Sequence, residues 1–191
     1  MSPPAHRVRY TYAEYLAFEA ASNVKHEYLA GQIYGMAGGS PDHAALAATV
    51  IGLLFGQLVS GRCRAFDSDL RVRVPATGLA TYPDVTVICG PREHHEEDDD
   101  AITNPTAIFE VLSPSTEGYD RGDKFEHYQR LPSLQHFILV SQDTQEIEVW
   151  TKSGQAWERR LAKPGKRVEL PAIGAMLDVS DLYDAAAAPR I

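Results

Sequence analysis

The sequence lacks the features that mark several large classes of protein. Basic residues are too few for a chain that grips nucleic acid through bulk positive charge, since 18 Lys and Arg face 26 Asp and Glu, a formal charge of −8. The longest apolar run, residues 44–59, is too short to span a membrane and is interpreted as a buried helix. No apolar stretch follows the basic residues of the N-terminus, so we expect no signal peptide and a cytoplasmic protein.

Cysteine is equally scarce. The chain has only Cys63 and Cys89, without a CxxC pattern and without a His-rich segment that could share a metal. This arrangement predicts neither a zinc site nor a disulfide framework. Both cysteines are therefore expected to be reduced residues of the core.

Local signatures of common enzymes are also missing. The sequence contains no GxxxxGK[ST], no GxGxxG after a strand, no HExxH and no GxSxG. These absences argue against phosphate-loop, dinucleotide-binding, zincin and α/β-hydrolase chemistry. One strong charge run, EHHEEDDD at 93–100, holds six of the acidic residues and is expected to be a solvated loop.

The segments that are present predict one mixed α/β (α+β) domain over 1–191, with a mixed sheet flanked by helices. A first helix is expected after an N-cap at Thr11, and a longer one after Ser40-Pro41 up to Gly61. Between them a hairpin turns at Ala30-Gly31. The later elements are expected to be strands at 70–74, 81–89 and 106–113 in one buried sheet, a helix over 120–131, C-terminal strands at 134–140, 146–150, 156–161 and 167–171, and a short helix at 181–184.

Two acidic residues stand inside apolar strand segments. Asp84 follows Pro83 in YPDVTVIC, and Glu110 lies in AIFEVL. A carboxylate in such a place is paired with a cationic side chain, stands at the end of its strand, or holds a hard cation such as Mg²⁺. Lys124 lies on the helix expected after the Glu110 strand, and its side chain is long enough to reach back to that strand. Considered on its own, Lys124 would be interpreted as a surface lysine. Two carboxylates and an ammonium around a metal form a set suited to phosphodiester hydrolysis.

The order and spacing of YPD, EVLSPST and DRxxK with Tyr128 resemble the Uma family of restriction-endonuclease-like proteins, within the PD-(D/E)XK nuclease superfamily. The resemblance covers residues 11–184. It implies a Mg²⁺-dependent endonuclease, with Mn²⁺ as a possible substitute, in which Asp84 and Glu110 are metal ligands. Leu112 stands where the superfamily usually has its lysine, so the resemblance assigns that role to Lys124 on the following helix.

Four further positions follow from the same resemblance. Glu27 matches an acid that often completes such metal sites, against the alternative of a solvent-facing hairpin residue. His43 could contact a phosphate or only cap its helix. Tyr128 could hydrogen-bond near the site or simply pack. Arg121 could pair with a site carboxylate or a substrate phosphate, or else with the neighbouring acids at 120 and 123.

Three functions are compatible with these residues. The first is a DNA endonuclease, plausibly a homodimer because two strands must be cut. The second is a nuclease fold that binds nucleic acid or protein with little turnover. The third is a structural or dimerisation domain whose acids are coincidental. Attraction of DNA could come through the metal, through a basic rim at Arg71, Arg73 and Arg121, or through a partner. The enzyme hypothesis requires the site residues to converge in one cleft.

Overall fold

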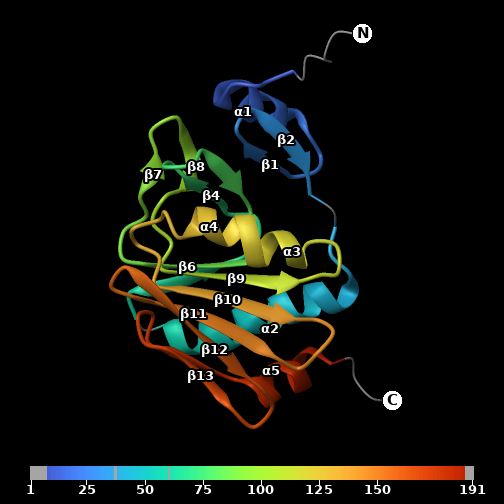
Figure 1. Ribbon diagram of the computed structural model, residues 1–191, viewed down its shortest axis with the longest axis vertical. Coiled ribbons are helices and arrows are strands. Elements are labelled where there is room, and N and C mark those ends of the chain that lie inside the picture. Colours follow the sequence, from blue (N-terminus) through green and yellow to red (C-terminus); the bar gives the residue numbers. More distant parts are fainter. Residues whose placement is uncertain (1–7, 37, 60, 188–191) are drawn as a thin grey trace.

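Residues 8–36, 38–59 and 61–187 are described by a computed structural model of the protein, and they form a mixed α+β fold (Figure 1). The helical segments are α1 (Tyr12–Ala21), α2 (Pro41–Leu58), α3 (Glu117–Tyr119), the π-helical turn η1 (Asp120–Lys124), α4 (Phe125–Tyr128) and α5 (Val179–Ala186). The strands are β1 (His26–Leu29), β2 (Gln32–Gly35), β3 (Cys63–Phe66), β4 (Arg71–Val74), β5 (Leu79–Thr81), β6 (Val85–Cys89), β7 (His94–His95), β8 (Asp98–Ile102), β9 (Ala107–Leu112), β10 (His136–Ser141), β11 (Ile147–Ser153), β12 (Ala156–Ala162), β13 (Arg167–Leu170) and β14 (Ala175–Asp178). The predicted fold class is confirmed.

The strands of the described residues build two six-stranded sheets and a two-stranded hairpin, β13–β14. The first sheet has the order β2-β1-β5-β4-β8-β7, and the second has the order β12-β11-β10-β9-β6-β3. Both are mixed, because β4 runs parallel to β8 and β9 runs parallel to β10. The prediction of one sheet holding 70–74 with 81–89 and 106–113 is wrong. Strand β4 instead turns back on β5, which pairs with β1, and so joins the first sheet.

Helix α2 begins as the sequence predicts. The Ser40 hydroxyl accepts a hydrogen bond from the His43 backbone N–H, and Pro41 occupies the first turn, where a missing N–H costs nothing. The buried face of the helix has apolar residues at i, i+4 spacing: Leu46, Val50, Leu54 and Leu58. Within the described ranges, no helix is long and apolar enough to cross a membrane.

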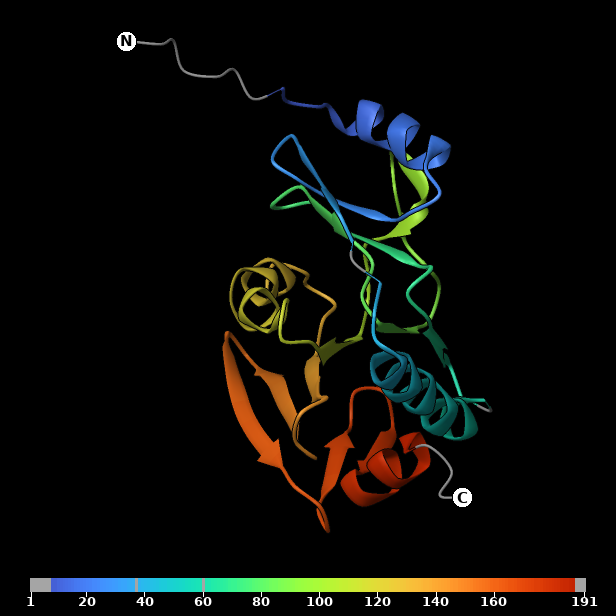
Figure 2. The same cartoon turned by 90° about the vertical axis from the view of Figure 1, so that its right-hand side faces the viewer.

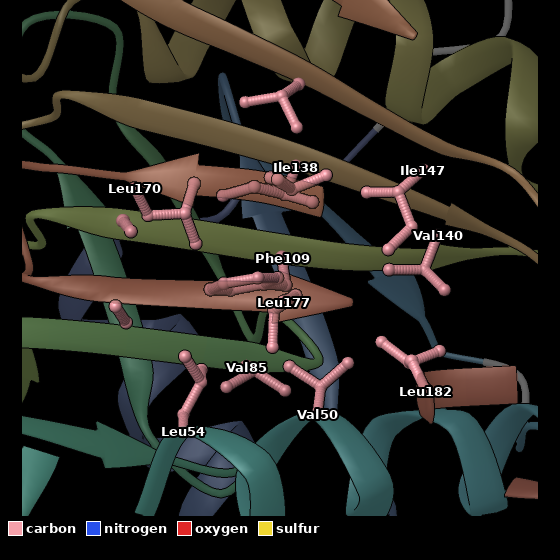
Figure 3. Packing of buried hydrophobic residues seen from close by; sticks show 14 of the residues in the cluster. Val50, Leu54, Val85, Phe109, Ile138, Val140, Ile147, Leu170, Leu177 and Leu182 are labelled. Atoms are coloured by element: carbon pink, nitrogen blue, oxygen red, sulfur yellow. The ribbon is translucent and has the colours of Figure 1, made fainter. Parts of the chain in front are cut away.

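The larger hydrophobic core lies between α2 and the second sheet. Figure 3 shows Val50 and Leu54 of α2 pointing toward Val85 and Phe109 on strands β6 and β9. Helix α5 and the β13–β14 hairpin contribute to the same layer. Because these side chains are fully buried, truncating Leu54 to alanine should cost roughly 2–5 kcal/mol of stability.

The opposite face of the second sheet is covered by α3, η1 and α4 (Figure 2). Along β9, side chains alternate between the two faces. Phe109 and Val111 join the α2 core, whereas Ile108 and Leu112 pack with the α4 segment. Glu110 lies on the same face of β9 as Ile108 and Leu112, so its side chain faces η1 and α4.

Helix α1 and the first hairpin also confirm the prediction. Thr11 and Glu14 form a capping box at the start of α1. At the hairpin turn, Ala30 and Gly31 have positive φ values of 49° and 84°, as a two-residue type I′ turn requires. Because β1 pairs with β5, the hairpin becomes part of the first sheet.

The prediction of one continuous helix over 120–131 is wrong, because the helical segment is interrupted. The segment holds η1 and then α4, which ends at Tyr128, and within η1 Gly122 has the non-helical angles φ −105° and ψ −106°. Glycine permits this kink because no Cβ opposes the unusual backbone. As a result Asp120 and Lys124 are both buried.

The acidic run at 93–100 is not the solvated loop that the sequence predicts. It forms β7 and the start of β8, and Asp98 is buried. Both carboxylate oxygens of Asp98 accept hydrogen bonds from Arg71, at 2.8 Å each, and the Tyr12 hydroxyl donates a further one. The remaining acids of the run stay at the surface because Asp98 alone has a buried cation opposite it.

The prediction of two reduced cysteines is also wrong, since Cys63 and Cys89 form a disulfide. The two residues stand directly opposite each other in the antiparallel pair of β3 and β6. Their proximity depends on strand register, which the spacing of the cysteines in the sequence does not reveal.

Candidate active site

Asp84 and Glu110 are brought together by the register of β6 and β9. Val85 lies opposite Phe109 in this antiparallel pair, so one further step places Asp84 opposite Glu110. The Asp84 carboxylate accepts a 2.7 Å hydrogen bond from the Val111 backbone N–H, which anchors it across the pair. The two strands thus present their acids at the same point of the second sheet.

Lys124 reaches this point from η1. The residue is only 5% exposed, and its Nζ lies 3.0 Å from Glu110 Oε1, 3.2 Å from Glu27 Oε1 and 3.5 Å from Asp120 Oδ1. The interpretation of Lys124 as an isolated surface lysine is therefore excluded. The helical return after β9 carries the ammonium back to the strand it has just left, as the reach argument predicts.

Glu27 arrives from the first sheet. It is buried rather than solvent-facing, and the Thr81 hydroxyl of the adjacent β5 donates a hydrogen bond to its carboxylate. The same carboxylate oxygen contacts Lys124. Glu27 thus joins the cluster from a strand far away in the sequence.

A cavity of about 830 Å³ opens at the cluster. Its walls are the N-terminal half of α2, the Ser-Pro loop after β9 and η1. Its acidic and basic lining residues among those described are Lys25, His43, Asp67, Asp84, Glu110, Asp120 and Lys124, and the Tyr82 phenol lines it as well. Glu27 contacts Lys124 but is not one of the described residues that line this cavity.

Asp120 is the site residue that the sequence reasoning missed. It is 4% exposed, lines the cavity and contacts Lys124. The available signal was its i, i+4 spacing to Lys124 within DRxxK, which puts two helical residues on one face. That spacing also suits an ordinary surface ion pair, so the pattern did not distinguish the two.

Tyr128 and His43 each hold one of the strand acids. The buried Tyr128 hydroxyl donates a 2.8 Å hydrogen bond to Glu110 Oε1. His43 Nε2 lies 3.2 Å from Asp84 Oδ2, and the hydrogen bond to Asp84 raises the pKa of His43 above its usual value. Both side chains therefore contact the predicted site acids, and Tyr128 both hydrogen-bonds there and packs against Phe137 in the core.

The three predicted rim arginines do not line the cavity. Arg121 forms ion pairs with Glu117, at 2.7 Å, and with Glu148, neither of which is a predicted partner. Arg71 and Arg73 are buried in the first sheet, where Arg73 lies 3.9 Å above the Tyr12 ring. A basic rim made of these residues is therefore wrong.

The cluster carries more negative than positive charge, and its pKa values reflect this. Burial, together with the charges of Asp120 and Asp84, raises the pKa of Glu110 to about 8 despite the nearby ammonium. Burial also raises the pKa of Asp120. Burial alone would lower the pKa of Lys124, but Glu110 and the other carboxylates raise it well above its usual range. Lys124 therefore stays cationic, and the raised pKa of Glu110 lets that carboxyl keep its proton near neutral pH.

The donor set fits a hard divalent cation. Within the described residues, no group of three or more His, Cys, Asp and Glu side chains is already arranged around one metal position. Mg²⁺ does not require such a group, because proteins usually hold it with one or two carboxylates while waters and substrate phosphates supply the rest. Asp84 and Glu110 offer two carboxylates on one cavity wall, and the excess negative charge there favours a cation.

Comparisons with known proteins place the chain in context. Residues 12–180 match the model of the Uma2 family, described as "Putative restriction endonuclease". The uncharacterized protein slr1290 of Synechocystis sp. is 39% identical over 183 residues, which is 95% of each chain. The uncharacterized protein sll1609 of the same organism is 35% identical over 144 residues, 75% of this chain and 81% of its own length.

The fold is shared with a solved structure. It is the crystal structure of a "putative nuclease belonging to DUF820" from Anabaena variabilis, with a TM-score of 0.75 over 92% of this chain and 98% of that one. The sequence identity is 21%, so the likeness concerns the arrangement of the elements.

Proposed function

The chain belongs to the Uma2 family, and on this premise we propose that it is a Mg²⁺-dependent endonuclease that hydrolyses phosphodiester bonds of DNA. The observation that carries the proposal is the buried Lys124 ammonium held against Glu110, with Asp84 on the same cavity wall. A buried lysine among carboxylates is costly to a fold, so its retention beside an open cavity supports a catalytic role.

The protonation state of each side chain suggests its role in the proposed reaction. Asp84 and Glu110 would hold the cation, which when bound supplies a Lewis acid that polarises the phosphate and lowers the pKa of a water. Lys124, kept cationic by its carboxylates, stabilises negative charge that develops on the phosphate rather than removing a proton. Tyr128 and His43 orient the two acids through their contacts with Glu110 and Asp84.

The wider parts of the proposal concern partners and setting. A cavity of about 830 Å³ is large enough to admit a nucleotide unit of a strand. Cleavage of both strands of a duplex favours a homodimer, with one site for each strand. Mn²⁺ would substitute for Mg²⁺ at oxygen ligands. A cytoplasmic setting, where bacterial DNA lies, belongs to the same proposal.

Cleavage assays with matched lysine variants test this function. Purified protein is incubated with supercoiled plasmid, single-stranded DNA and RNA in Mg²⁺, Mn²⁺ or chelator, and Lys124→Met is compared with Lys166→Met at an exposed position. We expect metal-dependent cleavage of DNA that falls at least about 100-fold in Lys124→Met and is unchanged in Lys166→Met. Circular dichroism melts establish that both variants are folded.

Asp84→Asn is a second, independent test, and it should also lose DNA cleavage. The substitution removes a carboxylate that would hold the metal while leaving Lys124 in place. A wild-type protein inert on every nucleic acid in both metals would contradict the proposal. So would equal cleavage by the wild type, Lys124→Met and Asp84→Asn.

A binding module without turnover is the second candidate, and one observation favours it. The guanidinium groups of Arg71, Arg73 and Arg121 and the Lys124 ammonium are all engaged with the protein's own acids or carbonyls. On this hypothesis the wild type binds DNA in a gel-shift assay without cutting it, and Glu110→Gln binds equally well. Loss of cleavage with retained binding in Glu110→Gln would instead support the enzyme.

A further inference from the structure

The cavity has a further wall, made by residues without a role in the proposed reaction. Two segments form it, residues 24–25 before β1 and residues 67–68 after β3. Lys25 contributes the basic group of this wall, and its ammonium lies 5.6 Å from the centroid of the Tyr82 ring, which also lines the cavity. Unlike the buried Lys124, Lys25 reaches the surface, since 37% of its side chain is exposed.

The basic residues described in the cavity lining differ in how firmly their anionic partners hold them. Lys124 is held by buried carboxylates, and His43 Nε2 contacts Asp84, whose side chain is only 17% exposed. The carboxylate beside Lys25 is that of Asp69, at 2.5 Å, and the Asp69 side chain is 81% exposed. Because an ion pair at the surface contributes little to stability, an anion from solution can replace Asp69 with little loss.

Lys25 would keep its orientation after such an exchange. Its Nζ donates a 2.8 Å hydrogen bond to the Ser68 carbonyl and lies 3.3 Å from the Ser68 hydroxyl. The Lys25 carbonyl in turn accepts a 2.9 Å hydrogen bond from the Met36 backbone N–H. An ammonium has three donors, so two of them stay on Ser68 while the third turns from Asp69 to a phosphate oxygen. The side chain is therefore an oriented group that can bind a phosphate.

A second pocket, of about 580 Å³, adjoins the cavity at the same lysine. Val24, Lys25 and Tyr82 line both pockets. The second pocket has Lys25 and Arg71 as its basic lining residues among those described, and a larger number of acidic ones: Glu19, Asp69, Glu97, Asp98, Asp99 and Asp100. Because like charges repel, a phosphate is disfavoured in the second pocket and favoured at Lys25. Lys25 thus marks the limit of the surface that a nucleic-acid strand can follow on this side of the cavity.

We propose that Lys25 is a specificity-determining residue that binds a backbone phosphate of the substrate strand, and that Asp69 competes with this phosphate for the ammonium. The inference rests on the proposed function, because it concerns the substrate of the same cavity. Lys124 serves the scissile phosphate in the proposed reaction, so Lys25 takes a neighbouring phosphate. Lys25 therefore contributes to binding of the strand rather than to breaking of the bond, and its loss should change KM more than kcat.

The test measures affinity for DNA without cleavage. Fluorescence anisotropy follows binding of a short fluorescein-labelled duplex with Ca²⁺ in place of Mg²⁺, and a denaturing gel establishes that the duplex stays intact. Lys25→Met is compared with Lys163→Met, which breaks another surface ion pair, with Glu146 at 2.6 Å, outside the described lining of the cavity. We expect Lys25→Met to raise Kd about 3–10-fold and to reduce the salt slope by about 1, and Lys163→Met to change Kd less than about twofold. A change below about twofold in a folded Lys25→Met would overturn the proposal.

Asp69→Asn should have the opposite effect. Removing the competing carboxylate is expected to lower Kd about two- to threefold, and this gain should vanish in the double variant Lys25→Met/Asp69→Asn because it acts through Lys25. Since Asp69 is exposed, this variant also decides the outcome if Lys25→Met does not fold in a thermal melt. An unchanged Kd in Asp69→Asn, or a loss of affinity like that of Lys25→Met, would make the ion pair structural and overturn the proposal.

Steady-state cleavage of the same duplex in Mg²⁺ separates binding from chemistry. Lys25→Met should raise KM about 3–10-fold with a smaller change in kcat. A fall in kcat of that size with an unchanged KM would overturn the assignment. A wild type that neither binds nor cuts DNA would refute the proposed function itself. A wild type that cuts DNA, with a Lys25→Met variant that binds and cuts it equally well, would refute only the role of Lys25.

Discussion

Two of the buried ionic clusters among the described residues differ in charge balance. In the first sheet, one guanidinium meets one carboxylate, since Arg71 donates to both oxygens of Asp98. In the site cluster, the single ammonium of Lys124 lies within 3.5 Å of three carboxylates, those of Glu27, Glu110 and Asp120. The first cluster is neutral, and the second has excess negative charge.

The difference teaches how to separate a structural ion pair from a functional one. Arg71 and Asp98 satisfy each other with bidentate geometry, and Tyr12 and Tyr82 add hydroxyl contacts. Nothing in such a pair needs a ligand. The Lys124 cluster opens to a cavity and keeps a deficit of positive charge, so a cation from solution would stabilise it.

Removing the cation of the balanced cluster should have the largest effect. Arg71→Met leaves Asp98 buried without a cationic partner and is expected to destabilise the protein by about 3–5 kcal/mol. Urea unfolding followed by circular dichroism measures the loss, with Arg92→Met at an exposed position as the control. A loss under about 1 kcal/mol would mean that the pair does not support the first sheet.

The two clusters should respond to pH in opposite directions. The folded-state pKa of Glu110, about 8, lies above its usual value, so between about pH 4.5 and 8 the folded state keeps a proton that the unfolded chain has released. Metal-free stability should therefore fall by about 2–4 kcal/mol as the pH rises through this window, and Glu110→Gln should remove that slope.

Asp98 behaves in the reverse sense. Despite its burial, hydrogen bonds from Arg71 and Tyr12 lower the pKa of Asp98, so its contribution is present above its usual pKa and is lost as the pH falls through the lowered one. Urea midpoints across the pH range check both slopes. An alkaline slope that persists unchanged in Glu110→Gln would have to come from other groups.

Binding of a divalent metal should change the free energy of unfolding by less than the loss of Arg71 or the change of pH does. Saturating Mg²⁺ is expected to stabilise the wild type by about 1–3 kcal/mol, more at pH 8 than at about pH 6, because Glu110 must give up its proton to bind the cation. Thermal melts with and without Mg²⁺ measure the gain. Asp84→Asn should lose it, and Arg92→Met should keep it in full; an equal gain in Asp84→Asn would place the metal elsewhere.

The smallest expected effects come from the two tyrosines that donate to buried acids. Tyr12→Phe removes a hydroxyl from Asp98 and should cost about 1–2 kcal/mol with cleavage unchanged. Tyr128→Phe removes one from Glu110 and should cost about 1 kcal/mol but reduce kcat about tenfold. Urea unfolding and cleavage rates together test this. If both variants reduced kcat equally, the site cluster could not be called catalytic and the Arg71–Asp98 cluster structural.

The local parts of the architecture could be predicted well. Ser40, Thr11 and the Ala30-Gly31 turn act through hydrogen bonds and backbone angles within a few residues, so their effects can be read directly from the chain. The alternation that buries Glu110 on one face of β9 is equally local. Errors began where a feature depended on which strands meet, as for the disulfide and for the sheet that contains β4.

The sequence by itself determined the mixed α+β class, the capped helix α2 and the acids at the start of β6 and within β9, because propensity, capping and period-two burial operate over short stretches. Only the tertiary structure decided which acids face the cavity. Glu27 comes from another sheet, the π-helical turn at Gly122 leaves Asp120 and Lys124 both buried, and Arg71 is taken up by Asp98. Each of these pairings joins groups whose distance is set by packing, so the balance of charge in each cluster emerges only when the sheets and helices have come together.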